Sequence, residues 1–430
     1  MSNKVKIGSF CKVRRGASPR PIDNPNYFGG DVGWIRISDV TKSFKYLNKT
    51  EQYVSPLGES LSVRVDKGDL VMSICGTIGR PIIINIPSCI HDGFVQLYDI
   101  KDANKEYLYY ILQHHEKDLE RKGQPGTQVN LNTTIVENFE IYFPAKPVQS
   151  KIARILSTAD AVIEKTQAAI AKYKAIKQGM LQDLFTRGID LKTNKLRPRY
   201  QDAPELYKES KLGMIPREWE VERIDTQAKI TTGSKDTQNK IEHGVYPFFV
   251  RSQTVEKIDS YTYDGEAILT SGDGVGVGKI YHYINGKFDF HQRVYMLYEF
   301  EKTISPKFLF YYFSNNFLAV VEKYSAKNTV DSVRMEMIAG MIIPLPPINE
   351  QKQISERLNA IDNKLQTEQT YLQKMQSLKK GLMEDLLSGK KCLNLDFQDE
   401  QINQDSKTIL QSVNRVNQDA DNYPVNPKIE

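Results

Sequence analysis

Residues 144–185 are PAKPVQSKIARILSTADAVIEKTQAAIAKYKAIKQGMLQDLF, and residues 346–387 are PPINEQKQISERLNAIDNKLQTEQTYLQKMQSLKKGLMEDLL. The two segments match at a constant offset of 202 residues, so that Gln149 corresponds to Gln351 and Asp160 to Asp362. Self-similarity at a fixed offset is the sequence signature of a duplicated structure. The chain is therefore expected to consist of two related halves.

Weaker similarity precedes each copy. GDLVMSICGTIGR (68–80) resembles GEAILTSGDGVGVGK (265–279), since each is an apolar strand that enters a glycine-rich turn. EYLYYIL (106–112) corresponds to KFLFYYF (307–313), and His91 corresponds to His291. The offset drifts from 197 to 202, as small loop insertions would cause. Each half is thus predicted to be a mixed globular domain of roughly 130 to 150 residues followed by one long helix.

Apolar residues in both long segments recur alternately four and three residues apart, which is the signature of a coiled coil. Lys177 and Lys379 interrupt the two apolar rows at corresponding positions. Two matched rows in one chain can satisfy each other, so an antiparallel helix pair is predicted; packing of each helix on its own domain is the alternative. The predicted interface residues are Ile152, Leu156, Ile163, Ile170, Leu184, Ile354, Leu358, Leu365, Leu372 and Leu386.

The predicted domain order follows from these patterns. It is a first domain (1–146), a long helix (147–188), a linker (189–211), a second domain (212–346), a second long helix (347–390) and a tail (391–430). A helix of about 40 residues spans roughly 60 Å. Such a helix is suited to be a spacer between the two domains.

Charge and composition restrict the class of protein. Residues 392–430 carry three basic and seven acidic side chains, whereas the chain as a whole has a net charge of +5, which leaves +9 for residues 1–391. The polar tail is expected to be disordered, and the basic remainder suits a polyanionic partner, although many cytosolic proteins are equally basic. The sequence has no 18-residue apolar run and no export signal, so neither a membrane span nor secretion is expected.

No catalytic or metal-binding constellation is predicted. SGDGVGVGKI (271–280) is not a phosphate-binding P-loop, because Asp273 replaces its first glycine and Ile280 its Ser or Thr. The six histidines lack metal-ligand spacing, and His91 and His291 are predicted to be scaffold residues. Four scattered cysteines without CxxC spacing indicate free thiols in a reducing cytoplasm. The glycine-rich turns are expected either to approach a DNA phosphate through backbone N–H groups or to be purely structural.

Polar loops are the better candidates for function. VRRGASPRP (13–21) and ITTGSKDTQNK (230–240) follow the first strand of each half, and their glycines, Gly16 and Gly233, suit a turn. Arg and Lys can bond guanine edges, while Asn and Gln can bond adenine. The DNA-binding candidates are Arg14, Arg15, Arg20, Arg36, Arg80, Gln128, Asn130, Lys235, Gln238, Asn239, Arg251 and Lys279. For each of them, solvated surface is the alternative.

Residues 1–390 resemble a known family, the specificity subunits of type I restriction-modification systems. The similar motifs are WIRISD (34–39), GTIG (76–79), GTQVNL (126–131), LGMIPREWEVERI (212–224) and IPLPPINEQKQISERL (343–358). The second half departs from the family pattern, because it has SAKNTVDSV where GTQVNL would be expected. The tail resembles nothing in the family.

This resemblance implies an α+β fold, with two mixed α/β target-recognition domains in tandem pseudo-repeat and two long antiparallel coiled-coil helices. It also implies a non-catalytic, cytoplasmic subunit that recognises a bipartite, asymmetric site in double-stranded DNA. Methyltransferase subunits, expected to be two, and restriction subunits would bind to it, and S-adenosylmethionine, ATP and magnesium would belong to those partners. The alternatives are a specificity subunit of another restriction-modification class, a scaffold for two non-DNA ligands, and an enzyme that acts alone on DNA.

Overall fold

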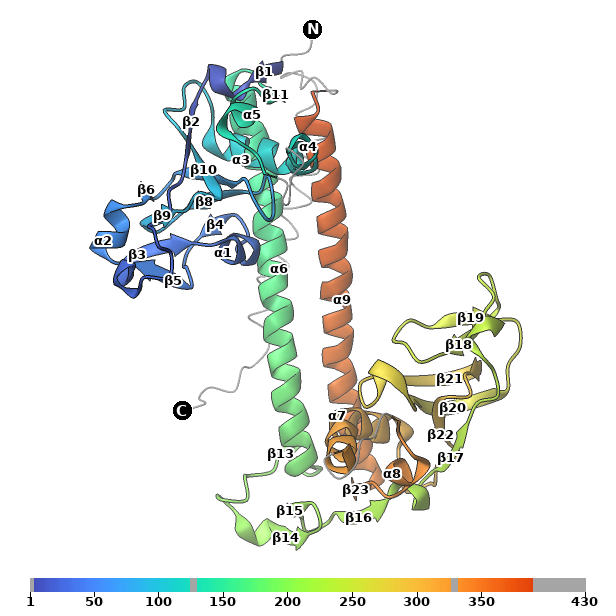
Figure 1. The fold of residues 1–430 in the computed structure, drawn as a ribbon. Coiled ribbons are helices and arrows are strands. Elements are labelled where there is room, and N and C mark those ends of the chain that lie inside the picture. The colour runs from blue at the N-terminus through green and yellow to red at the C-terminus, as the bar shows by residue number, and fades with distance from the viewer. Residues whose placement is uncertain (1–3, 124–129, 326–331, 390–430) are drawn as a thin grey trace. The chain divides into compact units, whose positions relative to one another are not determined.

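The computed structural model describes residues 4–123, 130–325 and 332–389 (Figure 1). The tail expected at 391–430 lies outside these residues. The chain divides into two compact units, residues 1–169 with 370–430 (unit 1) and residues 170–369 (unit 2). Helices α6 (Lys146–Thr186) and α9 (Ile348–Leu387) each contribute one segment to unit 1 and one to unit 2.

Unit 1 contains a five-stranded and a four-stranded sheet, whose central strands are rich in buried Val, Ile and Leu, and one further pair of strands. The larger sheet has the order β2 (Lys12–Arg15), β10 (Phe94–Tyr98), β7 (Leu70–Ser73), β8 (Pro81–Ile84) and β4 (Tyr46–Leu47). The smaller sheet has the order β5 (Gln52–Val54), β3 (Phe28–Ile35), β9 (Ser88–Ile90) and β6 (Val63–Val65). The first strand of the domain, β1 (Lys4–Lys6), pairs with the last, β11 (Glu140–Tyr142).

The helices of this domain are α1 (Ile37–Lys42), α2 (Pro56–Ser60), α3 (Lys105–His114), α4 (Glu116–Lys122) and α5 (Thr133–Glu137). Helix α3 begins after Asn104, whose side chain accepts a hydrogen bond from the Tyr107 N–H at 3.0 Å and so satisfies one free donor of the first turn. Buried aromatic and aliphatic residues of α3 share one hydrophobic core with Ile152 of α6 and Leu386 of α9. Helix α3 therefore fastens the sheets of unit 1 to the long helices.

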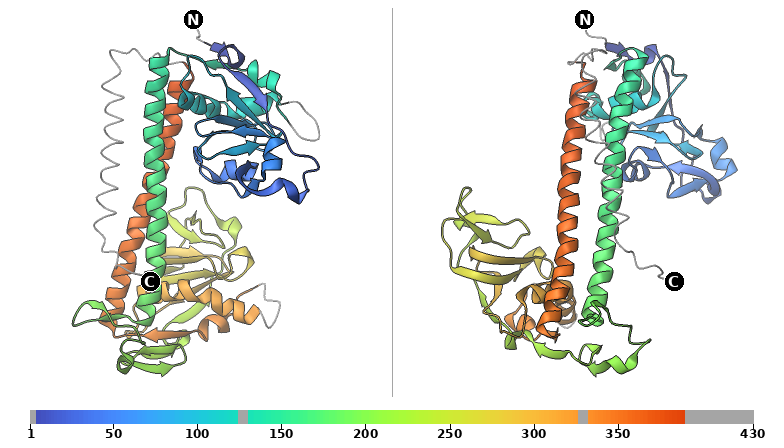
Figure 2. Two further views of the ribbon diagram at one scale, coloured as in Figure 1. Left: turned by 90° about the vertical axis from the view of Figure 1, so that its left-hand side faces the viewer. Right: turned by 180° about the vertical axis from the view of Figure 1, so that it is seen from behind.

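Unit 2 repeats this plan with a single six-stranded sheet. Its order is β17 (Lys229–Thr232), β22 (Val294–Tyr298), β20 (Tyr263–Ser271), β21 (Tyr281–Phe290), β18 (Tyr246–Phe249) and β19 (Glu256–Ile258). Here β16 (Glu220–Arg223) pairs with β23 (Ile342–Leu345) as β1 pairs with β11. In chain order, helix α7 (Pro306–Ser325) corresponds to α3, and α8 (Met335–Ala339) to α5. Figure 2 shows the same elements from two further sides.

Corresponding glutamines begin the long helices in the same way. Gln149 accepts a hydrogen bond from the backbone N–H of Asn104 at 2.9 Å, just before α3. Gln351 accepts one from the backbone N–H of Ser305 at 2.7 Å, just before α7. The repeat read from the sequence is thus a repeat of contacts, because each pair ties the start of a long helix to the start of a domain helix.

The segment expected to be the linker, 189–211, has defined structure. It contains the hairpin of β12 (Ile189–Asp190) and β13 (Lys195–Leu196) and the strand β14 (Tyr207–Ser210). Strand β14 pairs with β15 (Gly213–Pro216), so the expected domain boundary at residue 212 falls inside a hairpin. The expected boundary lies at the start of the motif LGMIPREWEVERI (212–224), which contains β15 but not its partner β14. Motif similarity alone therefore does not show this pairing.

A buried ion pair holds this segment to helix α9. Arg197 donates two hydrogen bonds to Glu350, at 2.5 and 3.0 Å, and the indole N–H of Trp219 donates a third to Glu350 at 3.1 Å. The Glu350 side chain is fully buried, and that of Arg197 is 8% exposed. The position of Glu350 is occupied in the first half by Val148, so this anchor belongs to unit 2 alone.

The long helices run antiparallel inside each unit, which confirms the predicted fold class. In unit 1, Ile152 and Leu156 share a core with Leu386. In unit 2, Leu184 shares a core with Ile354 and Leu358. The other predicted interface residues are also inside the described structure: Ile163 packs with the partly buried Leu372, and Ile170 and Leu365 are buried.

The lysine that interrupts the apolar row of α9 forms a buried ion pair in unit 1. Lys379 Nζ lies 2.6 Å from Asp160 Oδ1 of α6. Asp160 Oδ2 accepts a hydrogen bond from the hydroxyl of Tyr110 in α3 at 2.6 Å. The side chains of Lys379 and Asp160 are 13% and 5% exposed. This Tyr–Asp–Lys triad joins the domain helix to both long helices.

Unit 2 contains a corresponding triad, in which the helices exchange roles: the lysine now comes from α6 and the aspartate from α9. Lys177 Nζ of α6 lies 2.5 Å from Asp362 Oδ1 of α9, and Tyr311 of α7 hydrogen-bonds Asp362. Burial and the neighbouring Asp362 raise the pKa of Tyr311, which keeps its hydroxyl protonated as a donor. The side chains of Lys177 and Asp362 are 29% and 33% exposed. The second triad is therefore more hydrated than the first.

Candidate nucleic-acid interface

Strand β2 presents the first candidate arginines of unit 1. Arg14 and Arg15 are adjacent and exposed, so their side chains leave opposite faces of the strand. Arg14 Nε donates to Gln96 Oε1 at 2.6 Å, and its guanidinium lies 5.3 Å from the centre of the Tyr98 ring. Arg15 Nε donates to the backbone carbonyl of Asp92 at 2.7 Å. Arg14 is thus held by side chains of β10, and Arg15 by the backbone of the turn between β9 and β10.

Asp92 also holds Arg20. Its Oδ2 accepts from Arg20 Nη2 at 3.1 Å, and its Oδ1 accepts from the Ser18 hydroxyl at 2.8 Å. Burial opposes ionisation of Asp92, but the Ser18 hydrogen bond and the charges of Arg20 and Arg15 keep the pKa of Asp92 below its usual range. Asp92 is therefore an ionised hub that positions two exposed arginines, and we call it, with Arg15, Arg20 and Ser18, the Asp92 cluster.

Gly16 and Gly233 were expected to suit a turn, and the structure gives them a different role. A Cβ on Gly16 would lie 2.1 Å from the His91 carbonyl oxygen, and one on Gly233 would lie 2.1 Å from the Phe290 carbonyl oxygen. Neither glycine has a positive φ. The requirement is close approach of two backbones, which brings each candidate loop against the residues around His91 or His291.

Both aligned histidines shape the next turn, as predicted for scaffold residues. His91 Nδ1 accepts from the Gly93 N–H, and His291 Nδ1 accepts from the Arg293 N–H, each at 2.9 Å. Burial is the main cause that lowers the pKa of both imidazoles. Neutral imidazoles therefore fix the turns that carry Asp92 and Arg293.

The loop after β17 carries the first candidates of unit 2. Asn239 Oδ1 accepts from the Asp236 N–H at 2.7 Å, and the Gln238 N–H donates to Asp236 Oδ1 at 3.4 Å. Asp236 Oδ2 accepts from Gln292 Nε2 at 3.1 Å, and the Lys235 carbonyl accepts from the Gln292 N–H at 2.8 Å. The Asn239 side chain is thus engaged inside the loop, while Gln238 is bonded there through its backbone.

A second aspartate of unit 2 lies between two arginines. Asp273 Oδ1 accepts from Arg251 Nη1 at 3.0 Å, and Asp273 Oδ2 lies 3.8 Å from Arg293 Nε. The side chain of Asp273 is 23% exposed, whereas those of Arg251 and Arg293 are 45% and 66% exposed. We call these three residues the Asp273 cluster. It places a shielded carboxylate beneath two accessible guanidinium groups.

The remaining candidates are less connected. Arg36, Asn130 and Lys279 are exposed, and Arg80 is partly buried. Gln128 lies outside the described residues. The structure therefore gathers Arg15 with Arg20, and Lys235 with Gln238 and Asn239, and it places Arg251 beside Asp273. Arg36, Asn130 and Lys279 lie outside these clusters.

The two glycine-rich turns pack on helices. Gly79 and Gly278 have φ of +80° and +66°, where glycine is favoured. A Cβ on Gly79 would lie 3.1 Å from Leu119 Cβ of α4, and one on Gly278 would lie 2.9 Å from Leu318 Cδ1 of α7. Packing explains these two glycines, and an approach to phosphate by the same turns stays a prediction.

Reasoning from sequence missed Asp92, Asp273 and Arg293. Two of them follow the aligned His91 and His291 by one and two residues, so the alignment marked their location. It did not mark their importance, because acidic residues are not expected at a DNA-binding surface and hydrogen-bond partners are distant in sequence.

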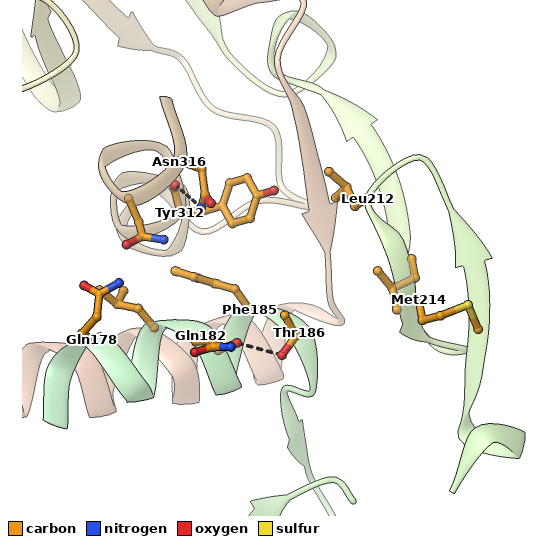
Figure 3. A pocket seen from close by; sticks show the side chains of 11 residues that line it. Gln178, Gln182, Phe185, Thr186, Leu212, Met214, Tyr312 and Asn316 are labelled. Atoms are coloured by element: carbon orange, nitrogen blue, oxygen red, sulfur yellow. Dashed lines mark hydrogen bonds between the residues drawn. The ribbon is translucent and has the colours of Figure 1, made fainter. Parts of the chain in front are cut away.

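A pocket of about 430 Å³ in unit 2 is lined by residues of α6, of α7 and of the hairpin of β14 and β15 (Figure 3). Figure 3 shows Gln178, Gln182 and Phe185 on α6 facing Tyr312 of α7, with Met214 on the hairpin of β14 and β15. Its lining residues include amides, hydroxyls and apolar groups but no carboxylate, imidazole, thiol or amine.

Within the described ranges, no group of three or more His, Cys, Asp or Glu side chains could hold a metal ion. No helix there is long and apolar enough to cross a membrane.

Comparisons with known proteins give the family. The model of the type I restriction modification DNA specificity domain matches the chain twice, over residues 2–173 and 216–377. The type I restriction enzyme MjaVIII specificity subunit of Methanocaldococcus jannaschii is 26% identical over 422 residues, which cover 91% of this chain and 94% of that protein. The type I restriction enzyme EcoDI specificity subunit of Escherichia coli is 26% identical over 176 residues, 41% of this chain and 38% of that protein.

A solved structure has the same fold. The crystal structure of the type I restriction-modification system S subunit from M. genitalium matches with a TM-score of 0.64 at 14% identity, and the match covers 89% of this chain and 95% of that one. The chain belongs to the type I restriction modification DNA specificity family. The resemblance predicted from the sequence is therefore confirmed.

Proposed function

We propose that this chain is the DNA-recognition subunit of a type I restriction-modification complex and that each unit recognises one half of a bipartite, asymmetric site. The observation that carries the proposal is the combination of a repeated scaffold with unlike polar clusters. Gly16 and Gly233, and His91 and His291, occupy matching positions, whereas the charged residues around them differ in type and in partner. Two copies of one scaffold with different surface chemistry suit one task on two different sequences.

The chemistry of the clusters fits duplex DNA. Exposed arginines can neutralise phosphates and can bond guanine edges in the major groove. Lys235 and Gln238, in the corresponding loop of unit 2, add further groups of the kinds that contact DNA. Because the residues differ between the units, the two half-sites are expected to be unrelated in sequence.

The long helices would set the distance between the half-sites. Each is about 40 residues long, and the ion pairs of Lys379 and Lys177 fix the alignment of α6 with α9 inside their respective units. A fixed helix pair predicts a fixed number of non-specific base pairs between the recognised halves.

The remaining functions are assigned to partners. Two methyltransferase subunits would bind the helix pair, and restriction subunits would bind that assembly. S-adenosylmethionine, ATP and magnesium would be held by those subunits, and this chain would contribute no catalytic group. The whole complex would act in the cytoplasm.

The test is to map methylated positions genome-wide in cells that carry the complete system and in cells from which this chain is deleted. The proposal predicts one motif with two unrelated halves and a constant gap, lost on deletion. A single continuous motif, a strict palindrome, or methylation that persists without the chain would contradict it. A binding titration of the complex on its mapped site should also weaken steeply with salt, because phosphate contacts release counterions.

A further inference from the structure

We propose that Asp273 and Asp92 are positioning residues that hold arginines for base recognition and that Arg293 is a base-contacting residue of unit 2. The inference rests on the proposed function and deepens it. It distinguishes residues that determine which DNA sequence is recognised from residues that only attract DNA.

The first argument is geometric. Asp273 is the more shielded partner, and each of its oxygens faces a different arginine, at 3.0 Å for Arg251 and 3.8 Å for Arg293. The backbone of Arg293 is fixed as well, because its N–H donates to His291 at 2.9 Å. A side chain of 66% exposure that starts from a fixed backbone and meets a fixed carboxylate has fewer orientations to lose when it binds.

The second argument concerns charge. On a surface that only attracts phosphates, every cationic side chain raises the affinity for DNA and every carboxylate lowers it. The Asp273 cluster contains two arginines and one aspartate, so the carboxylate halves the net positive charge of the cluster. Exposed ion pairs contribute only about 0–1 kcal/mol to stability, so folding alone gives little reason for the aspartate. An arginine aimed at a guanine edge needs orientation more than charge, and the aspartate supplies it.

Unit 1 reaches a similar arrangement with different residues. Asp92 lies after β9, whereas Asp273 lies after β20, so the two aspartates are not equivalent in the repeat. Asp92 binds Arg20 through its carboxylate and Arg15 through its backbone carbonyl. The independent appearance of an aspartate–arginine hub beside each aligned histidine is what a shared need for oriented arginines would produce.

The chain offers matched controls for charge. Lys12 Nζ lies 3.0 Å from Asp99 in unit 1, and Lys229 Nζ lies 2.6 Å from Glu299 in unit 2. These pairs occupy corresponding places at the ends of the β2–β10 and β17–β22 pairs, outside the two clusters. Asp99→Asn and Glu299→Gln therefore remove one negative charge from each unit without touching an oriented arginine.

The experiment uses the complete complex with the variants Arg293→Lys, Asp273→Asn, Asp92→Asn and the two controls. Binding is measured on the mapped duplex, on duplexes with one half-site replaced, and on a random duplex; thermal unfolding checks that each variant is folded. Arg293→Lys keeps the charge but loses the bidentate fork, so discrimination at one half-site should fall roughly 10- to 100-fold with the salt dependence unchanged. Asp273→Asn should weaken discrimination at that same half-site by about ten-fold, and Asp92→Asn at the other, while affinity for random DNA holds or rises.

Equal discrimination in Arg293→Lys and the unaltered complex would overturn the role of Arg293. Loss of discrimination in Glu299→Gln or Asp99→Asn as large as in the cluster variants would overturn the positioning role, because any lost charge would then suffice. Effects of Asp273→Asn on both half-sites alike would overturn it too. If the unaltered complex has no bipartite site, the proposed function itself fails, and that outcome is read before any variant is compared.

Discussion

The two units differ most where their scaffolds are most alike. Beside His91, unit 1 has Asp92 with Arg15, Arg20 and Ser18. Beside His291, unit 2 has Gln292 bonded to Asp236, and Arg293 next to Asp273. The histidines themselves make the same hydrogen bond to the residue two positions on. The comparison teaches that the repeat preserves the residues that shape each loop, while the residues presented by the loop are free to differ.

A second difference lies at the attachment of each domain to the helices. Both units use a Tyr–Asp–Lys triad, but only unit 2 adds the buried Arg197–Glu350 pair, where the first half has Val148. The extra pair holds the segment that precedes the second domain. Unit 2 should therefore depend on a contact that unit 1 lacks.

The largest expected effect is on that contact. Glu350→Ala leaves the buried Arg197 guanidinium without its carboxylate and should lower the free energy of unfolding by about 3–5 kcal/mol. Denaturant unfolding measures the change, and hydrogen exchange should place it in residues 187–224. Glu218→Gln, which removes the 70% exposed second partner of Arg197, is the control and should change stability by less than about 1 kcal/mol. Loss of protection in unit 1 instead of unit 2 would break the comparison.

The triads should respond unequally to the same substitution. Lys379→Met leaves Asp160 buried and unpaired by charge, and should cost about 3 kcal/mol or more. Lys177→Met leaves the more hydrated Asp362 and should cost about 1 kcal/mol. Equal losses in the two variants would show that the difference in exposure between the triads has no energetic meaning. The double variant Lys379→Met with Asp160→Asn should recover part of the loss.

Matching scaffold positions should respond equally. Gly16→Ala and Gly233→Ala each force a Cβ toward a carbonyl oxygen and should each lower stability by about 1–3 kcal/mol. Thermal unfolding of the two variants side by side is the measurement. Tolerance of alanine at one position only would mean that the two loops are not built on the same backbone contact.

The smallest effect is expected at the corresponding helix glycines. No atom lies within 4 Å of a Cβ built on Gly179 or Gly381. Gly179→Ala and Gly381→Ala should therefore stabilise the chain by about 0.5–1 kcal/mol each, through helix propensity. If the variants are more stable yet bind methyltransferase subunits less tightly, the glycines make room for those subunits. Destabilised variants would contradict the open surroundings of both positions.

Sequence periodicity was sufficient to predict the helix pair, because Ile152, Leu156, Ile354 and Leu358 belong to apolar rows with heptad spacing. Such residues require only other apolar side chains as partners, and the pattern itself supplies these. It marked Lys177 and Lys379 as interruptions but not as ion pairs, because their partners lie on the opposite helix. The buried ion pair of Arg197, in the expected linker, could not be predicted for the same reason, because its partner Glu350 is 153 residues away. Loop chemistry was the least predictable, because Asp92 and Asp273 gain their meaning from arginines that the fold brings to them.

The central claim is that the helix pair of α6 and α9 fixes the gap between the two half-sites. One heptad inserted into each helix, after Ile170 and after Leu372, keeps the apolar rows in phase. It adds about 10 Å along the axis, which corresponds to roughly three base pairs. Methylation mapping with this variant should return the same two half-sites with a longer gap, within the twist that the duplex can absorb. A folded, active complex that methylates the original motif with an unchanged gap would contradict the account.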